Sequence, residues 1–134
     1  LLDRLAAWRP SGGGDLRDEV AWLRISDSSL TLLPSPTGLS LPGGPREPGE
    51  RGAAALCRLL EQRWSVRLSP ERLHPAAALV VPEPDGAWRR VSCYRANGPQ
   101  PVVPGGVSRP LGETTACDPT AAALQELLRQ GLVL

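Results

Sequence analysis

Residues 41–50 read Leu-Pro-Gly-Gly-Pro-Arg-Glu-Pro-Gly-Glu, and an uninterrupted helical run follows them over residues 51–64. The pair Gly43 and Gly44 indicates a turn at the end of a strand, because glycine tolerates backbone conformations that other residues avoid. A polar loop follows, and Glu50 is expected to open the helix, where a carboxylate suits the positive end of the helix dipole. A strand end, a glycine turn, a short loop and a helix in this order are typical of units that bind phosphates. We therefore expect the functional site in this stretch.

The same segment resembles the Nudix box. That signature reads glycine, five residues, glutamate, seven residues, arginine-glutamate, an aliphatic residue, any residue, two glutamates, any residue, glycine and an aliphatic residue. Five of its positions match in register, namely Gly44, Glu50, Arg58, Leu60 and Val66. The preceding Leu-Pro-Gly-Gly and the Gly-Glu pair at the helix start are also common in the family.

The box also departs from the family pattern. Where the family has glutamates this chain has Leu59, Gln62 and Arg63, and Ser65 replaces the closing glycine. The family's glutamates gather magnesium or manganese against the substrate diphosphate, and a hard cation needs several converging carboxylate oxygens. Of these box glutamates only Glu50 remains.

Helix geometry predicts that positions 59, 62, 63 and 66 share one face, so one acidic surface is replaced as a whole. Glu61 lies about 100° around the helix from Gln62 and cannot stand in for it. Arg63 places a permanent positive charge where the divalent cation would lie. The resemblance thus implies Glu50 as the one candidate catalytic residue and metal ligand, and a nucleotide- or diphosphate-binding set of Gly43, Gly44, Glu47, Arg58 and Arg63.

Composition excludes several classes of partner. The 134 residues fit one domain, and the net charge of +1, from 15 basic and 14 acidic residues, gives no electrostatic drive toward nucleic acid or an anionic membrane. No apolar run is long enough to span a bilayer.

The three cysteines have neither metal-ligand nor disulfide-framework spacing, so we expect a reduced, cytoplasmic setting. The chain has no methionine, so we expect that it does not begin at a translational start and is a trimmed chain, an ordered fragment or a piece of a longer sequence.

The order of the predicted elements agrees with the resemblance. Residues 1–14 are expected to form a helical arm with a glycine-rich linker, and residues 15–134 the Nudix-like domain. In that domain we predict a hairpin with strands near 20–25 and 30–33, the box helix from Glu50 to Trp64, strands at 76–81 and 90–96, a possible short strand at 102–103, and a helix capped by Asp118 that stops at Gly131. The resemblance implies an α+β fold, an α/β/α sandwich with a mixed central sheet.

Three functional hypotheses remain open on the sequence. The first is a catalytically impaired Nudix-type domain that binds a nucleotide or nucleoside-diphosphate derivative, or a protein partner, without a cofactor. The alternative is an active pyrophosphohydrolase dependent on magnesium or manganese, with metal held by Glu50, Glu47 and a further acid such as Glu61 or Glu113. The third is a purely structural part of a larger assembly.

Overall fold

The computed structural model describes residues 16–83 and 85–131. One sheet has the strand order β5-β1-β7-β6, formed by Gly43–Pro45, Leu16–Trp22, Trp88–Ala96 and Leu73–Pro82. A second sheet contains β2 (Ile25–Ser26), β3 (Ser29–Ser35) and β4 (Gly38–Ser40), with β8 (Val107–Pro110) also paired to β3. The helices are α2 (Gly52–Trp64) and α3 (Pro119–Arg129), and a 3₁₀ turn η1 covers Pro70–Arg72.

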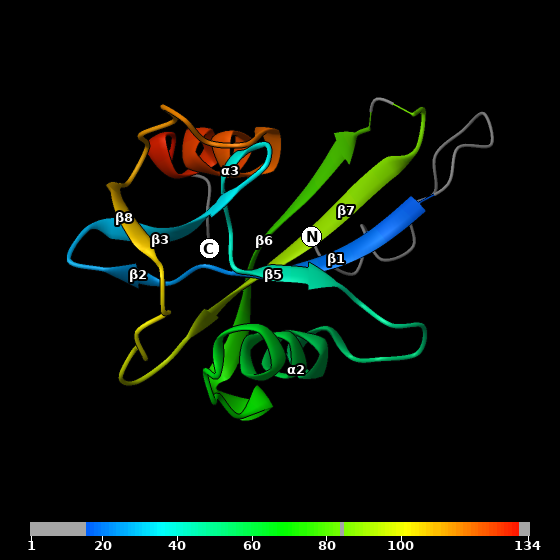
Figure 1. Ribbon diagram of the computed structural model, residues 1–134, viewed down its shortest axis with the longest axis vertical. Coiled ribbons are helices and arrows are strands. Elements are labelled where there is room, and N and C mark those ends of the chain that lie inside the picture. The colour runs from blue at the N-terminus through cyan, green and yellow to red at the C-terminus, as the bar shows by residue number, and fades with distance from the viewer. Residues whose placement is uncertain (1–15, 84, 132–134) are drawn as a thin grey trace.

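The first sheet is mixed, and a helix covers each of its faces (Figure 1). Strand β1 runs parallel to β7 and antiparallel to β5. Its side chains alternate between two cores: Val20 and Trp22 join the cluster under α2, whereas Ala21, and Leu23 directly after the strand, join the cluster that includes α3. The expected α+β sandwich with a mixed central sheet is therefore confirmed.

The predicted hairpin is much shorter than expected. Strands β2 and β3 pair around a turn at Asp27 and Ser28, whose φ angles of 51° and 60° suit a tight two-residue hairpin turn. Residues 16–22, which contain the first part of the predicted strand, pair instead with β5 and β7 in the other sheet. Local patterning does not signal this pairing, because parallel partners lie far apart in sequence.

Two further boundaries differ from the sequence-based prediction. The helix α2 begins at Gly52, so Glu50 precedes it and no acidic residue lies in its first turn. Residues 102–103 form no strand. The short strand in this part of the chain is β8 (Val107–Pro110), which pairs with β3.

The closing helix agrees with the prediction. The Asp118 carboxylate accepts a hydrogen bond of 2.7 Å from the backbone N–H of Ala121, as an N-cap should. The predicted N-terminal arm, residues 1–14, lies outside the described residues. Neither α2 nor α3 has the length and apolar character that a membrane crossing requires.

Ser65, at the position where the box pattern has glycine, adopts a backbone conformation that favours glycine. Ser65 follows the last turn of α2 with φ 56° and ψ 30°, the left-handed conformation in which helices commonly end. Its backbone N–H donates to the carbonyl of Glu61. A side chain is unfavourable in this conformation, by about 1–2 kcal/mol, and glycine avoids that cost.

We expect Ser65→Gly to raise the free energy of unfolding, by about 1 kcal/mol or less once the greater freedom of glycine in the unfolded chain is included. Chemical denaturation would measure the change. The matched control is Ser69→Gly, because Ser69 has an extended φ of −88° and makes no capping hydrogen bond. A stabilisation by Ser69→Gly as large as that by Ser65→Gly would contradict the explanation.

Candidate functional site

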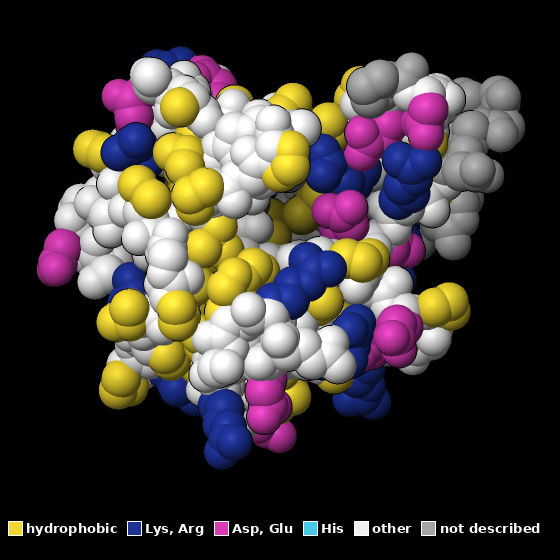
Figure 2. Space-filling view, viewed as in Figure 1, with side chains coloured by type: hydrophobic (Ala, Val, Ile, Leu, Met, Phe, Trp, Pro, Cys, Tyr) yellow, Lys and Arg dark blue, Asp and Glu magenta, His cyan; other side chains and the backbone are white. Residues whose placement is uncertain are grey.

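A cavity of about 330 Å³ opens on the α3 face of the first sheet. Its lining comes from β1, β5, β7, the connection between β3 and β4, the start of α3 and the end of α2. Figure 2 shows this side of the molecule hollowed between α2 and α3, with hydrophobic side chains inside and charged ones of both signs around it. The cavity therefore joins elements from the whole length of the described chain.

Arg63 reaches this cavity from the last turn of α2, where its charge also suits the helix dipole. Its Nη1 donates a hydrogen bond of 2.9 Å to the carbonyl of Gly43 on the edge strand β5. A Cβ on Gly44 would lie 2.8 Å from the same Nη1 atom, so the missing side chain of Gly44 makes room for the guanidinium. Among the described residues no carboxylate forms an ion pair with Arg63.

At Gly43 the lack of a side chain matters for backbone packing, not for the placement of Arg63. It pairs with Ala21, and a Cβ built on it would lie 2.0 Å from the carbonyl oxygen of Val20. Real Cβ atoms do not approach backbone so closely, and a backbone atom cannot rotate away as a side chain can. Gly43 thus sets the close packing of β5 against β1.

Two carboxylates, the half-buried Glu19 and the buried Asp118, line the same cavity as Arg63. Glu19 is 3.5 Å from Arg89, which also forms an ion pair of 2.9 Å with Glu83. Burial raises the pKa of Glu19 and of Asp118, and the positive charge of Arg89 opposes both shifts. The lining contains the two acids Glu19 and Asp118 and the two bases Arg63 and Arg89, so its formal charges cancel.

A buried hydroxyl group also lines the cavity. Thr120 is 6% exposed, and its Oγ1 has no hydrogen-bond partner within residues 16–83 and 85–131. Buried polar groups in native proteins nearly always have a partner. The Thr120 Oγ1 is therefore a buried polar atom that the described residues leave without a hydrogen bond.

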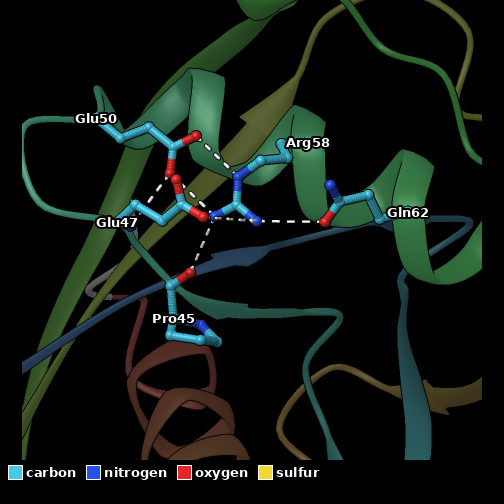
Figure 3. A network of polar contacts seen from close by, with 5 residues as sticks. All are labelled: Pro45, Glu47, Glu50, Arg58 and Gln62. Atoms are coloured by element: carbon cyan, nitrogen blue, oxygen red, sulfur yellow. Dashed lines mark hydrogen bonds and ion pairs between the residues drawn. The ribbon is translucent and has the colours of Figure 1, made fainter.

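The remaining box residues form a polar network beside the cavity (Figure 3). Arg58 binds both oxygens of Glu50, with Nε to Oε2 at 2.9 Å and Nη2 to Oε1 at 3.0 Å. Glu50 also accepts from the backbone N–H of Glu47, while Arg58 donates to the Gln62 amide oxygen and to the Pro45 carbonyl. The hydrogen bonds from Arg58 hold the pKa of Glu50 below its usual range.

These residues do not fit the divalent metal that the box resemblance implies. The part of the chain that the structure describes contains no cluster of three or more His, Cys, Asp or Glu side chains able to hold an ion. Both oxygens of Glu50 are engaged by Arg58. Magnesium and manganese require several oxygen ligands on one point, and the local donors do not supply them.

The predicted single face of positions 59, 62, 63 and 66 is also divided. Leu59 and Val66 are each 3% exposed and belong to the core under α2, whereas Gln62 and Arg63 are exposed. Val66 lies beyond the end of the helix, which explains part of the difference. Position 59 therefore contributes to packing in this chain.

The structure separates the predicted binding residues into two groups. Gly43, Gly44 and Arg63 line the cavity, whereas Glu47, Glu50 and Arg58 belong to the network outside it. The two further acids considered as metal ligands do not line the cavity. Glu61 pairs with Arg67, and Glu113 accepts a hydrogen bond from the backbone N–H of Thr115.

Several polar cavity residues had no functional signal in the sequence, among them Glu19, Asp118 and Thr120. Glu19 stands near the start of a predicted strand, and Asp118 is recognisable only as a helix cap. Thr120 becomes notable only because packing buries its hydroxyl without a partner. Their proximity depends on how α3 meets the first sheet, which no local pattern encodes.

Comparison with solved structures identifies the fold. The solution structure of the E. coli ORF135 protein matches with a TM-score of 0.74 at 19% identity, covering 92% of this chain and 95% of that one. A MutT Nudix hydrolase from Burkholderia pseudomallei matches with a TM-score of 0.68 at 18% identity, covering 85% and 98%. The MutT protein from Methanosarcina mazei gives 0.66 at 14% identity, covering 90% and 98%.

The chain therefore has the Nudix fold. No sequence model of a protein family matches it, and no curated protein matches it.

The two glycines should respond differently to the same substitution. Gly44→Ala is expected to fold with a nearly unchanged unfolding temperature, because the atom it meets is the end of the flexible Arg63 side chain. Gly43→Ala is expected to lower the unfolding temperature by several degrees, because it forces β5 away from β1. Thermal unfolding of both variants tests this, and equal losses would contradict the distinction.

The cavity carboxylates predict a pH dependence of stability. A raised pKa means that the folded protein binds the proton more tightly than the unfolded chain, so the contribution of Asp118 to stability increases as the pH falls through the raised pKa. Asp118→Asn keeps a capping oxygen and removes the titration. We expect wild-type protein to gain unfolding temperature relative to this variant as the pH falls from about 7 to about 4.

Glu113→Gln serves as a control for which the expected change of stability with pH has the opposite sign. Hydrogen bonds from Thr115 lower the pKa of Glu113, so its stabilising contribution is lost as the pH falls through the lowered pKa. The unfolding temperature of wild type relative to Glu113→Gln should therefore decrease on acidification. The same trend for both variants would show that the assigned environments are wrong.

Proposed function

We propose that this Nudix-fold domain binds a nucleotide in the cavity and does not carry out metal-dependent hydrolysis. The observation that carries the proposal is the placement of Arg63. Its guanidinium lines the cavity without a carboxylate partner in the described chain, at a box position where the family has a glutamate. A guanidinium binds phosphate directly, since its N–H groups match the geometry of phosphate oxygens.

The rest of the lining suits a nucleoside. Glu19 and Asp118 contribute carboxylate groups to the lining, and Thr120 contributes a buried polar side chain. Apolar surface comes from Ala21 and Val91 on adjacent strands of the sheet. A pocket of mixed apolar surface with a few polar groups is the usual design of a small-molecule site.

We propose that the chain does not hydrolyse its ligand because it lacks the carboxylates that would bind a metal or act as a base. Cleavage of a diphosphate by the family's chemistry needs a water activated by a metal or a base. The one surviving box acid, Glu50, is held by two hydrogen bonds from Arg58 and lies outside the cavity lining. A group engaged in this way binds neither a metal nor a proton readily.

The proposal is tested by measuring the unfolding temperature with nucleotides, in the presence of magnesium and in the presence of the chelator EDTA. We expect at least one nucleotide to raise the unfolding temperature equally with magnesium and with EDTA, because Arg63 supplies the positive charge. Arg63→Gln should abolish that shift. Arg67→Gln is the matched control, since Arg67 is 87% exposed, pairs with Glu61 and does not line the cavity.

Turnover assays with magnesium complete the test. No release of nucleoside monophosphate is expected, and Glu50→Gln should leave nucleotide binding unchanged because Glu50 is outside the cavity. A magnesium-dependent turnover that Glu50→Gln abolishes would establish the active-hydrolase alternative. A failure of every nucleotide to bind under both conditions would overturn the proposal.

A further inference from the structure

The charges around the cavity limit how many phosphoryl groups a ligand can bring. Arg63 is the basic side chain of the lining without an ion-pair partner among the described residues, because Arg89 is shared by Glu19 and Glu83. Of the basic residues near the box, Arg58 is paired with Glu50, and Arg46 shares the Asp18 carboxylate with Arg90. Neither Arg46 nor Arg58 lines the cavity. We infer that the ligand is a nucleoside monophosphate, or another molecule with one phosphoryl group on a polar ring system. This inference rests on the proposed function.

One guanidinium matches one phosphoryl group. The Nη1 of Arg63 is tied to the Gly43 carbonyl, which fixes the side chain on β5 and leaves its other N–H groups to donate to a ligand. Two N–H groups of one arginine can bind two oxygens of one phosphate in parallel. A second phosphoryl group would find no further unpaired base in the lining, and the two acids there would repel it.

The size of the cavity points the same way. Its volume of about 330 Å³ lies at the lower end of the range of about 300–1,000 Å³ for small-molecule pockets. That space suits one nucleobase, one sugar and one phosphate. The box resemblance implies enzymes in which a metal neutralises the substrate diphosphate. This chain instead has one arginine, Arg63, at a box position where the family has a glutamate.

Isothermal titration in EDTA tests the inference with the nucleoside and its 5′-mono-, di- and triphosphates, for adenosine, guanosine, cytidine and uridine. We expect the monophosphate of the preferred base to bind about tenfold or more tightly than the nucleoside, because of the charged hydrogen bonds to Arg63. Each added phosphoryl group should weaken binding, by about threefold or more.

Arg63→Gln should remove the difference between nucleoside and monophosphate, whereas Arg67→Gln should keep it. A di- or triphosphate that binds in EDTA as tightly as the monophosphate, or more tightly, would overturn the inference while leaving the proposed nucleotide site intact. An unchanged monophosphate preference in Arg63→Gln would overturn it as well. If no compound of the series binds with or without magnesium, the proposed function itself fails.

Discussion

The close contact of β5 with β1 at Gly43 is the constraint on which the site depends. A side chain at Gly43 would collide with the Val20 carbonyl, so only glycine lets the two strands pair at this point. The contact places the next residue, Gly44, against the end of α2, where its lack of a side chain leaves room for Arg63. The double glycine thus joins a strand-packing requirement to the position of a positive charge.

The polar box residues of this chain form hydrogen bonds with one another. Arg58 and Glu50 satisfy each other, and Gln62 adds a neutral acceptor where a second carboxylate would stand in the family. Leu59 is buried in the core under α2, where such a side chain contributes about 1.5–3 kcal/mol. A carboxylate returned to position 59 would replace a buried apolar side chain in this core, so a single substitution toward the family pattern would cost stability.

Strong local patterns predicted the elements that they specify directly. The apolar stripe of α2 and the Asp118–Pro119 start of α3 encode their own helices, and the double glycine marks the strand end. The parallel pairing of β1 with β7 could not be predicted in this way, because it joins residues about seventy positions apart along the chain through contacts that no short pattern contains. The same limit applies to the cavity: Arg63 was identifiable from the box, but Glu19, Asp118 and Thr120 meet it only after the sheet and α3 have assembled.

The long connection rich in proline and glycine after β7 has a structural role in this fold. Arg24 donates to the carbonyls of Gln100 and Pro101, at 3.1 Å and 2.5 Å, and Arg72 donates to the carbonyl of Asn97 at 2.9 Å. Backbone carbonyls of a loop need partners, and these two guanidinium groups supply them from the ends of other elements. No residue from 97 to 113 lines the cavity, whereas the connection between β3 and β4 and the first turn of α3 do. If the cavity is the proposed nucleotide site, those two segments would set its ligand preference, while the proline-rich connection contributes hydrogen bonds to the scaffold.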